Sequence, residues 1–129
     1  MKKILIIDDS PTIRKVVKAK VEKMGLAVVG TAADGEEGIR MFQEQAPDLV
    51  LLDLTMPNMD GRKCLEEIRR IDGNARVMIL SAILCPEVEA DCLQRGAACF
   101  VSKNNLFTTD ILESRILEAM GRAALPAAA

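Results

Sequence analysis

The stretch LLDLTMPNMDG, residues 51–61, ends an apolar run on a carboxylate and then enters a turn. The apolar part is typical of a strand that is buried on both faces, and Pro57, Asp60 and Gly61 predict the turn. Asp53 therefore stands at the end of a buried strand, where desolvating its charge costs free energy unless other groups compensate it. Those groups must come from elsewhere in the fold.

Similar apolar runs recur along the chain, each too short for a helix and rich in Ile, Val or Leu. They predict five strands, at residues 4–7, 26–32, 49–53, 76–80 and 98–101. Segments with helical periodicity separate them. In the first, Ser10 can cap a helix that has Pro11 in its first turn and ends at Gly25. The other helices are expected at about 35–45, 61–71, 86–95 and 105–122.

Alternating strands and helices predict a parallel sheet with right-handed crossovers and helices on both faces. We expect an α/β fold: a (βα)5 doubly wound, five-stranded parallel sheet in a three-layer sandwich, with the flavodoxin-like strand order 2-1-3-4-5. A chain of 129 residues has the length of one domain. We assign that domain to residues 1–122 and expect 123–129 to be a short, frayed C-terminal tail.

Composition excludes several classes of function. Half of the residues are hydrophobic and the net charge is -2, so a nucleic-acid partner is not expected. No apolar run is long enough to cross a bilayer, and the run after MKK stops at two aspartates, so we expect a cytoplasmic protein without membrane insertion. The chain has no His and four Cys without C-x-x-C spacing. Zinc sites and His-activated nucleophiles are therefore disfavoured, and the thiols are expected to be reduced and mostly buried.

Reactive side chains stand at four of the five strand ends. In an open parallel sheet, ligands bind beyond the carboxyl ends of the strands. The side chains found there are Asp8 and Asp9 after the first strand, Asp53 at the end of the third, Ser81 just past the fourth and Lys103 two residues past the fifth.

The expected strand order brings Asp8, Asp9 and Asp53 together, because the first and third strands are neighbours. Two carboxylates about 4 Å apart repel by roughly 4 kcal/mol at an effective dielectric constant of about 20. Either one carboxyl is protonated or a cation lies among them. A few oxygen ligands with room for water suit Mg²⁺ better than Ca²⁺ or zinc.

A carboxylate beside Mg²⁺ and a lysine can attack phosphorus to form an aspartyl phosphate. Lys103 and the Ser81 hydroxyl could neutralise the oxygens of the transferred group. The sequence has no G-x-x-x-x-G-K-[ST] loop, so ATP is not the expected donor.

In combination, these motifs closely resemble the receiver domain of two-component response regulators, of the stand-alone type. The residues that carry the resemblance are DD at 8–9, LLDLTMPNMDG around Asp53, LSA at 80–82 and the lysine of FVSKN at 100–104. The resemblance implies that Asp53 accepts a phosphoryl group from a partner histidine kinase or phosphotransfer protein. Such a protein is a phosphoacceptor switch, with only self-phosphotransfer and autodephosphorylation activity, rather than an enzyme.

The same resemblance implies roles for the other residues. Asp9, Asp53 and the backbone carbonyl of Thr55 bind Mg²⁺ directly, and Asp8 acts mainly through water. Ser81 turns toward the phosphate and Phe100 rotates inward behind it. The face formed by the fourth helix, fifth strand and fifth helix then presents a changed surface to a downstream protein target.

Two positions depart from the pattern of the family. Lys103 is followed by Asn104 where the family usually has proline, often after a cis bond, and a cis bond before a non-proline residue costs about 3–4 kcal/mol. The bond is therefore either trans or strained. Phe100 stands where a tyrosine is frequent, so this position has no hydroxyl, and plain core packing is the other interpretation of Phe100.

Other interpretations of the chain remain open. A phosphatase of the haloacid-dehalogenase type also forms an aspartyl phosphate, but it places an acid two residues after the nucleophile, where this chain has Thr55. A flavin-binding module is disfavoured because Asp8 and Asp9 would repel the flavin phosphate. A phosphate sink without a dedicated target is a further alternative.

The first helix carries a stripe of five basic residues: Arg14, Lys15, Lys18, Lys20 and Lys23. This stripe is either a solvated helix face or a surface that steers an acidic phosphodonor.

Overall fold

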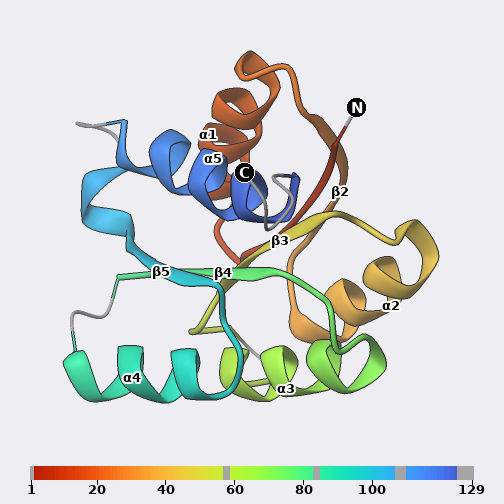
Figure 1. Ribbon diagram of the computed structural model, residues 1–129, viewed down its shortest axis with the longest axis vertical. Helices are drawn as coiled ribbons and strands as arrows, with labels where there is room; N and C mark the ends of the chain where they lie inside the picture. The colour runs from red at the N-terminus through yellow and green to blue at the C-terminus, as the bar shows by residue number, and fades with distance from the viewer. Residues whose placement is uncertain (1, 57–58, 83–84, 107–109, 125–129) are drawn as a thin grey trace.

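The structure is a computed structural model, in which residues 2–56, 59–82, 85–106 and 110–124 are described. Five parallel strands form one sheet in the order β2-β1-β3-β4-β5 (Figure 1). Their bounds are Lys3–Ile7 (β1), Ala27–Ala32 (β2), Leu49–Asp53 (β3), Val77–Ser81 (β4) and Cys99–Ser102 (β5). The sequence-based prediction of a parallel sheet with this order is confirmed.

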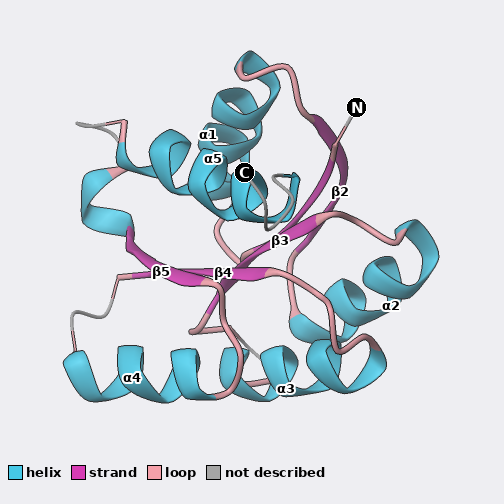
Figure 2. Cartoon of the chain, viewed as in Figure 1, coloured by secondary structure: helices cyan, strands magenta, loops and turns pink. Residues whose placement is uncertain are grey.

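The helices lie on both faces of the sheet, as Figure 2 shows by secondary structure. The α-helices are Pro11–Lys23 (α1), Gly35–Gln45 (α2), Gly61–Ile71 (α3), Pro86–Gln94 (α4) and Ile111–Ala124 (α5). A short 3₁₀ helix, η1, covers Lys103–Asn105. None of the helices in the described ranges is both long and apolar enough to cross a membrane.

The sheet separates two apolar cores. Helices α1 and α5 cover one face, where Ile4 and Ile6 of β1 pack against Val17 and Ile116. Helices α2, α3 and α4 cover the other face, where the core includes Ile7 of β1. Alternate residues of each strand point to opposite faces, so a strand covered on both sides is apolar throughout. Every residue of β3, including Asp53, is buried.

The last helix begins later than the periodicity predicts. We expected it at about 105–122, but α5 begins at Ile111 and ends at Ala124. The chain first forms η1, which Ser102 caps: its hydroxyl accepts a hydrogen bond from the backbone N–H of Asn104 at 3.1 Å. Local capping by serine competes with the helical pattern there. Of the expected C-terminal tail 123–129, the first two residues belong to α5 and residues 125–129 lie outside the described residues.

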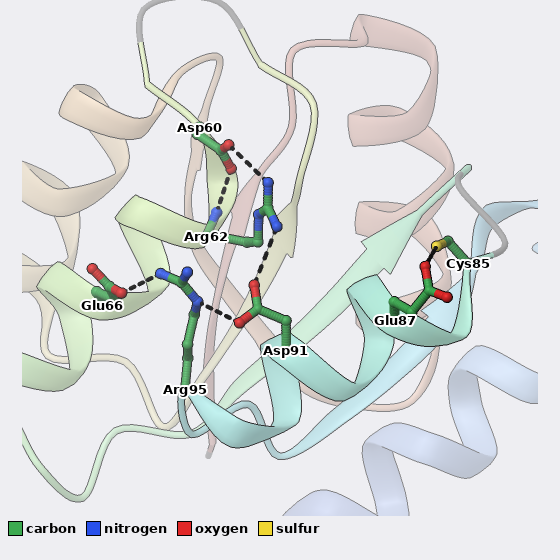
Figure 3. Close-up of polar contacts among 7 residues, drawn as sticks. All are labelled: Asp60, Arg62, Glu66, Cys85, Glu87, Asp91 and Arg95. Carbon is green, nitrogen blue, oxygen red and sulfur yellow. Dashed lines mark hydrogen bonds and ion pairs between the residues drawn. The ribbon is translucent and has the colours of Figure 1, made fainter.

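A network of ion pairs joins α3 to α4 (Figure 3). Arg62 Nη1 lies 3.1 Å from Asp91 Oδ2, and Arg95 Nε lies 3.0 Å from Asp91 Oδ1. Arg95 also contacts Glu66 on α3, and Arg62 Nη2 lies 3.5 Å from Asp60 Oδ2. Asp91 is therefore the shared partner of two arginines, Arg62 on α3 and Arg95 directly after α4.

The burial of the four cysteines agrees only in part with the expectation that they are mostly buried. Cys64 and Cys92 are buried, whereas Cys85 and Cys99 are half-buried. Burial raises the pKa of the Cys64 thiol to about 12, so this thiol is protonated at neutral pH and packs as a small apolar side chain.

Candidate functional site

The register of the sheet brings the acidic residues to one edge. Ile7 of β1 pairs with Leu52 of β3, so Asp8, directly after β1, and Asp53, the last residue of β3, lie at the same level. The backbone N–H of Asp8 donates to Ala32 O at 2.9 Å, which extends the pairing of β1 and β2 to the site. The position of these carboxylates is therefore a direct result of strand order and register.

The three carboxylates converge. Asp8, Asp9 and Asp53 each offer an oxygen, and these oxygens lie within 4.8 Å of one another. Asp8 and Asp53 are buried and Asp9 is exposed. The site therefore has two desolvated negative charges and one that reaches solvent.

Lys103 lies between the two buried carboxylates. Its Nζ is 2.7 Å from Asp8 Oδ2 and 3.1 Å from Asp53 Oδ1. The structure places Lys103 directly after β5 as the first residue of η1, one residue nearer the strand than expected. The Lys103–Asn104 peptide bond is trans, so the lysine reaches both carboxylates without the cis bond that is frequent in the family.

The charges of this cluster shift one another's protonation. Burial and, next, the charge of Asp8 raise the pKa of Asp53, Lys103 acts to lower it, and the net result is a pKa of about 6. Burial alone would lower the pKa of Lys103, but its hydrogen bond to Asp8 and the charge of Asp53 raise it overall. At neutral pH the lysine is charged and Asp53 is largely ionised.

Backbone groups hold the two buried carboxylates in place. The N–H of Ser10 donates to Asp8 Oδ1 at 2.9 Å, and the N–H of Thr55 donates to Asp53 Oδ1 at 3.3 Å. The start of α3 lies directly against the end of β3, because Gly61 N–H donates to Leu54 O at 2.9 Å. A Cβ at Gly61 would lie 2.4 Å from Asp53 O, so a side chain there would collide with the backbone.

Arg14 supports the site and was missed by the sequence analysis. Its Nη1 donates to the backbone carbonyl of Asp8 at 2.6 Å. The sequence showed Arg14 only as part of the basic stripe on the first helix. Lys20 of the same stripe is 3.2 Å from Glu113 of α5, so it joins two helices. The exposed part of the stripe is therefore narrower than expected and consists of Lys15, Lys18 and Lys23.

The remaining predicted residues lie at or near this edge. Ser81 is the last residue of β4, where the prediction placed it just past the strand, and it is buried. Thr55 is exposed and lines a cleft of about 390 Å³ together with Met56, Asp60 and Arg62. Phe100 is half-buried on β5, where it packs against the core on the face of the sheet that α2, α3 and α4 cover.

The donor set fits a magnesium ion. Two buried carboxylates and a third that reaches solvent offer hard oxygen ligands within the span of one ion and leave positions for water. Side chains of His or Cys, which would favour zinc, do not contribute to this group of carboxylates.

Comparisons with known proteins agree with this geometry. The family model "Response regulator receiver domain" matches residues 4–116. The chemotaxis protein CheY of Bacillus subtilis is 38% identical over 120 residues, which cover 93% of this chain and 95% of that protein. The CheY of Thermotoga maritima is 33% identical over 94% of this chain and 96% of its own. The chain is a response regulator receiver domain.

Solved structures place the receiver domain in the same family. The CheX–CheY–BeF3–Mg+2 complex from Borrelia burgdorferi matches with a TM-score of 0.84 and 34% sequence identity. The match covers 97% of this chain and 90% of that one. This receiver domain is therefore CheY-like in sequence and in the flavodoxin-like order of its strands, and receiver domains of this kind are phosphoacceptor switches.

Proposed function

We propose that this receiver domain acts as a stand-alone response regulator in which Asp53 accepts a phosphoryl group from a partner histidine kinase or phosphotransfer protein. The observation that carries the proposal is the convergence of Asp8, Asp9 and Asp53 around Lys103 at the carboxyl edge of the sheet. The stand-alone form is supported by the two CheY relatives, which match over 95% and 96% of their own lengths.

The transfer step uses the ionised carboxylate of Asp53 as the nucleophile. A carboxylate oxygen attacks phosphorus, the new O–P bond forms, and the P–N bond of a phosphohistidine breaks with its electron pair leaving on the imidazole, which takes a proton from solvent. The pKa of about 6 keeps most Asp53 side chains ionised at neutral pH. Lys103 already lies 3.1 Å from Asp53 Oδ1, where it can neutralise an equatorial oxygen of the phosphoryl group.

We assign Asp9, Asp53 and the Thr55 carbonyl as the protein ligands of Mg²⁺, with Asp8 acting through water. The role of Asp8 is supported by its side-chain contacts, since Ser10 and Lys103 already occupy positions around it. When bound, Mg²⁺ supplies positive charge that offsets the carboxylates and the incoming phosphoryl oxygens. The similar CheY of B. burgdorferi was solved as a complex with CheX, BeF3 and Mg²⁺.

Phosphorylation is proposed to change the surface formed by α4, β5 and α5. Ser81 ends β4 beside the site, and Phe100 lies on the neighbouring strand β5. Phe100 also lines a groove of about 360 Å³ with Cys85 and Pro86 at the start of α4 and Ile111 and Arg115 of α5. A shift of Ser81 toward the phosphate and of Phe100 inward would alter this groove, where a downstream protein target would bind.

The test is the intact mass of the protein after incubation with Mg²⁺ and acetyl phosphate. We expect one added phosphoryl group in the wild-type protein and none in Asp53→Asn. Glu44→Gln, which removes one exposed carboxylate from the outer surface of α2, is the matched control and should be phosphorylated normally. Equal labelling of wild type and Asp53→Asn would overturn the assignment of the acceptor, and many turnovers per chain on small phosphate esters would favour a phosphatase instead.

A further inference from the structure

Gly38 of α2 lies in unusually close contact with the end of β1. A Cβ built at Gly38 would lie 2.5 Å from Ile7 Cδ1, 2.8 Å from its Cγ1 and 3.0 Å from its Cγ2. Real side-chain carbons do not approach this closely, so any side chain at residue 38 would have to displace either Ile7 or α2. The absence of a side chain on Gly38 is therefore what allows this packing.

Ile7 has little freedom to move away. It is 1% exposed, and it pairs with Ala32 of β2 on one side and with Leu52 of β3 on the other. Its side chain belongs to the core between the sheet and α2, together with Phe42. Moving Ile7 away from residue 38 therefore requires either a different side-chain rotamer, which disturbs its neighbours in the core, or a shift of the β1 backbone.

Helix α2 is also fixed where it meets the sheet. Asp34 caps it by accepting a hydrogen bond from Glu37 N–H at 2.9 Å. Gly35, one turn before Gly38, packs against Met59 in the segment that follows Asp53, where a Cβ would lie 2.8 Å from Met59 Sδ. The first turn of α2 thus contacts both chain segments that carry the acidic residues, and glycine stands at each contact.

Ile7 is directly followed by the acidic pair. Asp8 is held by hydrogen bonds and an ion pair that depend on its exact position: 2.9 Å from its N–H to Ala32 O, 2.9 Å from Ser10 N–H to Oδ1, and 2.7 Å from Oδ2 to Lys103 Nζ. A shift of a few tenths of an ångström at Ile7 would lengthen these contacts. Packing at residue 38 is therefore connected through one residue to the candidate metal site.

We propose that Gly38 is a positioning residue for the Mg²⁺ site, acting through Ile7 to set the end of β1 and with it Asp8 and Asp9. The proposal rests on the proposed function, because it assumes that these carboxylates bind Mg²⁺. Alanine is normally more favourable than glycine inside a helix, so helix propensity alone predicts that Gly38→Ala stabilises α2. The close contact with Ile7 predicts instead that the substitution disturbs the packing of α2 on β1.

The experiment is a calorimetric Mg²⁺ titration of the full chain at a temperature where each variant is folded, with amide chemical shifts of residues 8 and 9 recorded before the metal is added. We expect Gly38→Ala to raise the Mg²⁺ dissociation constant about three- to tenfold and to shift both amides in the metal-free protein. The matched control is Gly73→Ala, because a Cβ at Gly73 meets nothing within 4 Å, and it should bind like wild type.

Rescue separates positioning from a general loss of stability. Ile7→Val removes the Cδ1 atom that lies nearest the new methyl group, so Gly38→Ala/Ile7→Val should recover much of the affinity and the wild-type amide shifts. If Gly38→Ala alone does not fold, recovery of both folding and Mg²⁺ binding in the double variant supports the proposal. Wild-type affinity in Gly38→Ala, or a double variant without recovery, would overturn it. A wild-type protein that does not bind Mg²⁺ would instead overturn the proposed function.

Discussion

The ammonium group of Lys103 lies closer to Asp8, at 2.7 Å, than to Asp53, at 3.1 Å. Both carboxylates are buried, so a single cation offsets two desolvated negative charges. One negative charge of the pair remains uncompensated. Burial of Asp53, together with this excess negative charge, keeps the pKa of Asp53 raised at about 6, although Lys103 acts to lower it.

Removing the charge of Lys103 should therefore affect both protonation and phosphotransfer. In Lys103→Met we expect the pKa of Asp53 to rise above 6, because the charge and hydrogen bond that oppose the rise are lost. Phosphorylation by acetyl phosphate at pH 7 should slow by at least about tenfold, since fewer carboxylates are ionised and the cation near the phosphoryl oxygens is gone. Carboxyl NMR titration and time-resolved mass measurements check the two parts.

Lys63→Met is the matched control for this substitution, because it removes an exposed lysine on α3. It should leave the titration of Asp53 and the phosphorylation rate unchanged. An unaltered Asp53 titration in Lys103→Met would contradict the electrostatic account of the site.

The raised pKa of Asp53 also predicts a stability that depends on pH. The folded protein holds the Asp53 proton more tightly than the unfolded chain, whose pKa is near 3.8. Protonation of Asp53 therefore contributes to the free energy of unfolding in full below pH 3.8, and this contribution is lost as the pH rises through about 6. Without metal, Asp53→Asn should increase the free energy of unfolding at pH 7.5 by about 1–3 kcal/mol and have little effect at pH 4.

Urea unfolding in the presence of EDTA at the two pH values measures this difference. Glu44→Gln should show no such pH-dependent gain. Added Mg²⁺ should stabilise the wild-type protein more than Asp53→Asn, because the variant lacks one carboxylate of the proposed Mg²⁺ site and a ligand of the native state raises the free energy of unfolding. A gain at pH 4 as large as that at pH 7.5 would show that the effect does not come from ionisation of Asp53.

Most of the fold could be predicted because its signals are local and repeated. The apolar runs locate each strand to within one residue at either end, and the Asp53 segment could be placed at the end of a buried strand from its composition alone. The start of α5 could not be located, because a serine cap at Ser102 creates a 3₁₀ turn inside a segment whose apolar spacing also suits a helix.

The site could be predicted as a set of residue types but not as a set of contacts. The strand order brings Asp8 and Asp53 together, and their positions at strand ends were visible in the sequence. The hydrogen bond from Arg14 to the Asp8 carbonyl was not, because a surface arginine looks the same in sequence whether it binds solvent or backbone. The contact between Gly38 and Ile7 depends on how closely α2 approaches the sheet, which spacing does not encode.

The ion pairs between α3 and α4 predict a salt-sensitive contribution to stability (Figure 3). Hydrogen bonding by Arg95 lowers the pKa of Asp91, and Arg62 contributes in the same direction. In Asp91→Asn the two arginines lose their shared partner, and we expect a decrease in Tm of about a few degrees at low salt. High salt should reduce the difference from wild type, because the pairs are partly exposed.

Glu67→Gln is the control for Asp91→Asn, since Glu67 forms its ion pair with Arg70 of the same helix. Its effect on Tm should be smaller. A difference between Asp91→Asn and wild type that is independent of salt would indicate lost packing rather than lost ion pairs.

The exposed lysines of α1 predict a difference between protein and small-molecule phosphodonors. Lys15 and Lys18 are exposed beside a hollow of about 200 Å³ on α1, whereas Arg14 and Lys20 make internal contacts and should be left unchanged. Lys15→Glu/Lys18→Glu should slow phosphotransfer from an acidic protein donor by about tenfold at low salt, because it removes electrostatic steering. The rate of phosphorylation by acetyl phosphate should be unaffected. The control is Lys2→Glu/Lys63→Glu, which makes the same change in net charge away from α1 and should alter neither the rate with the protein donor nor the rate with acetyl phosphate. If the α1 variant slowed both reactions equally, its effect would lie in the site itself and steering by α1 would be excluded.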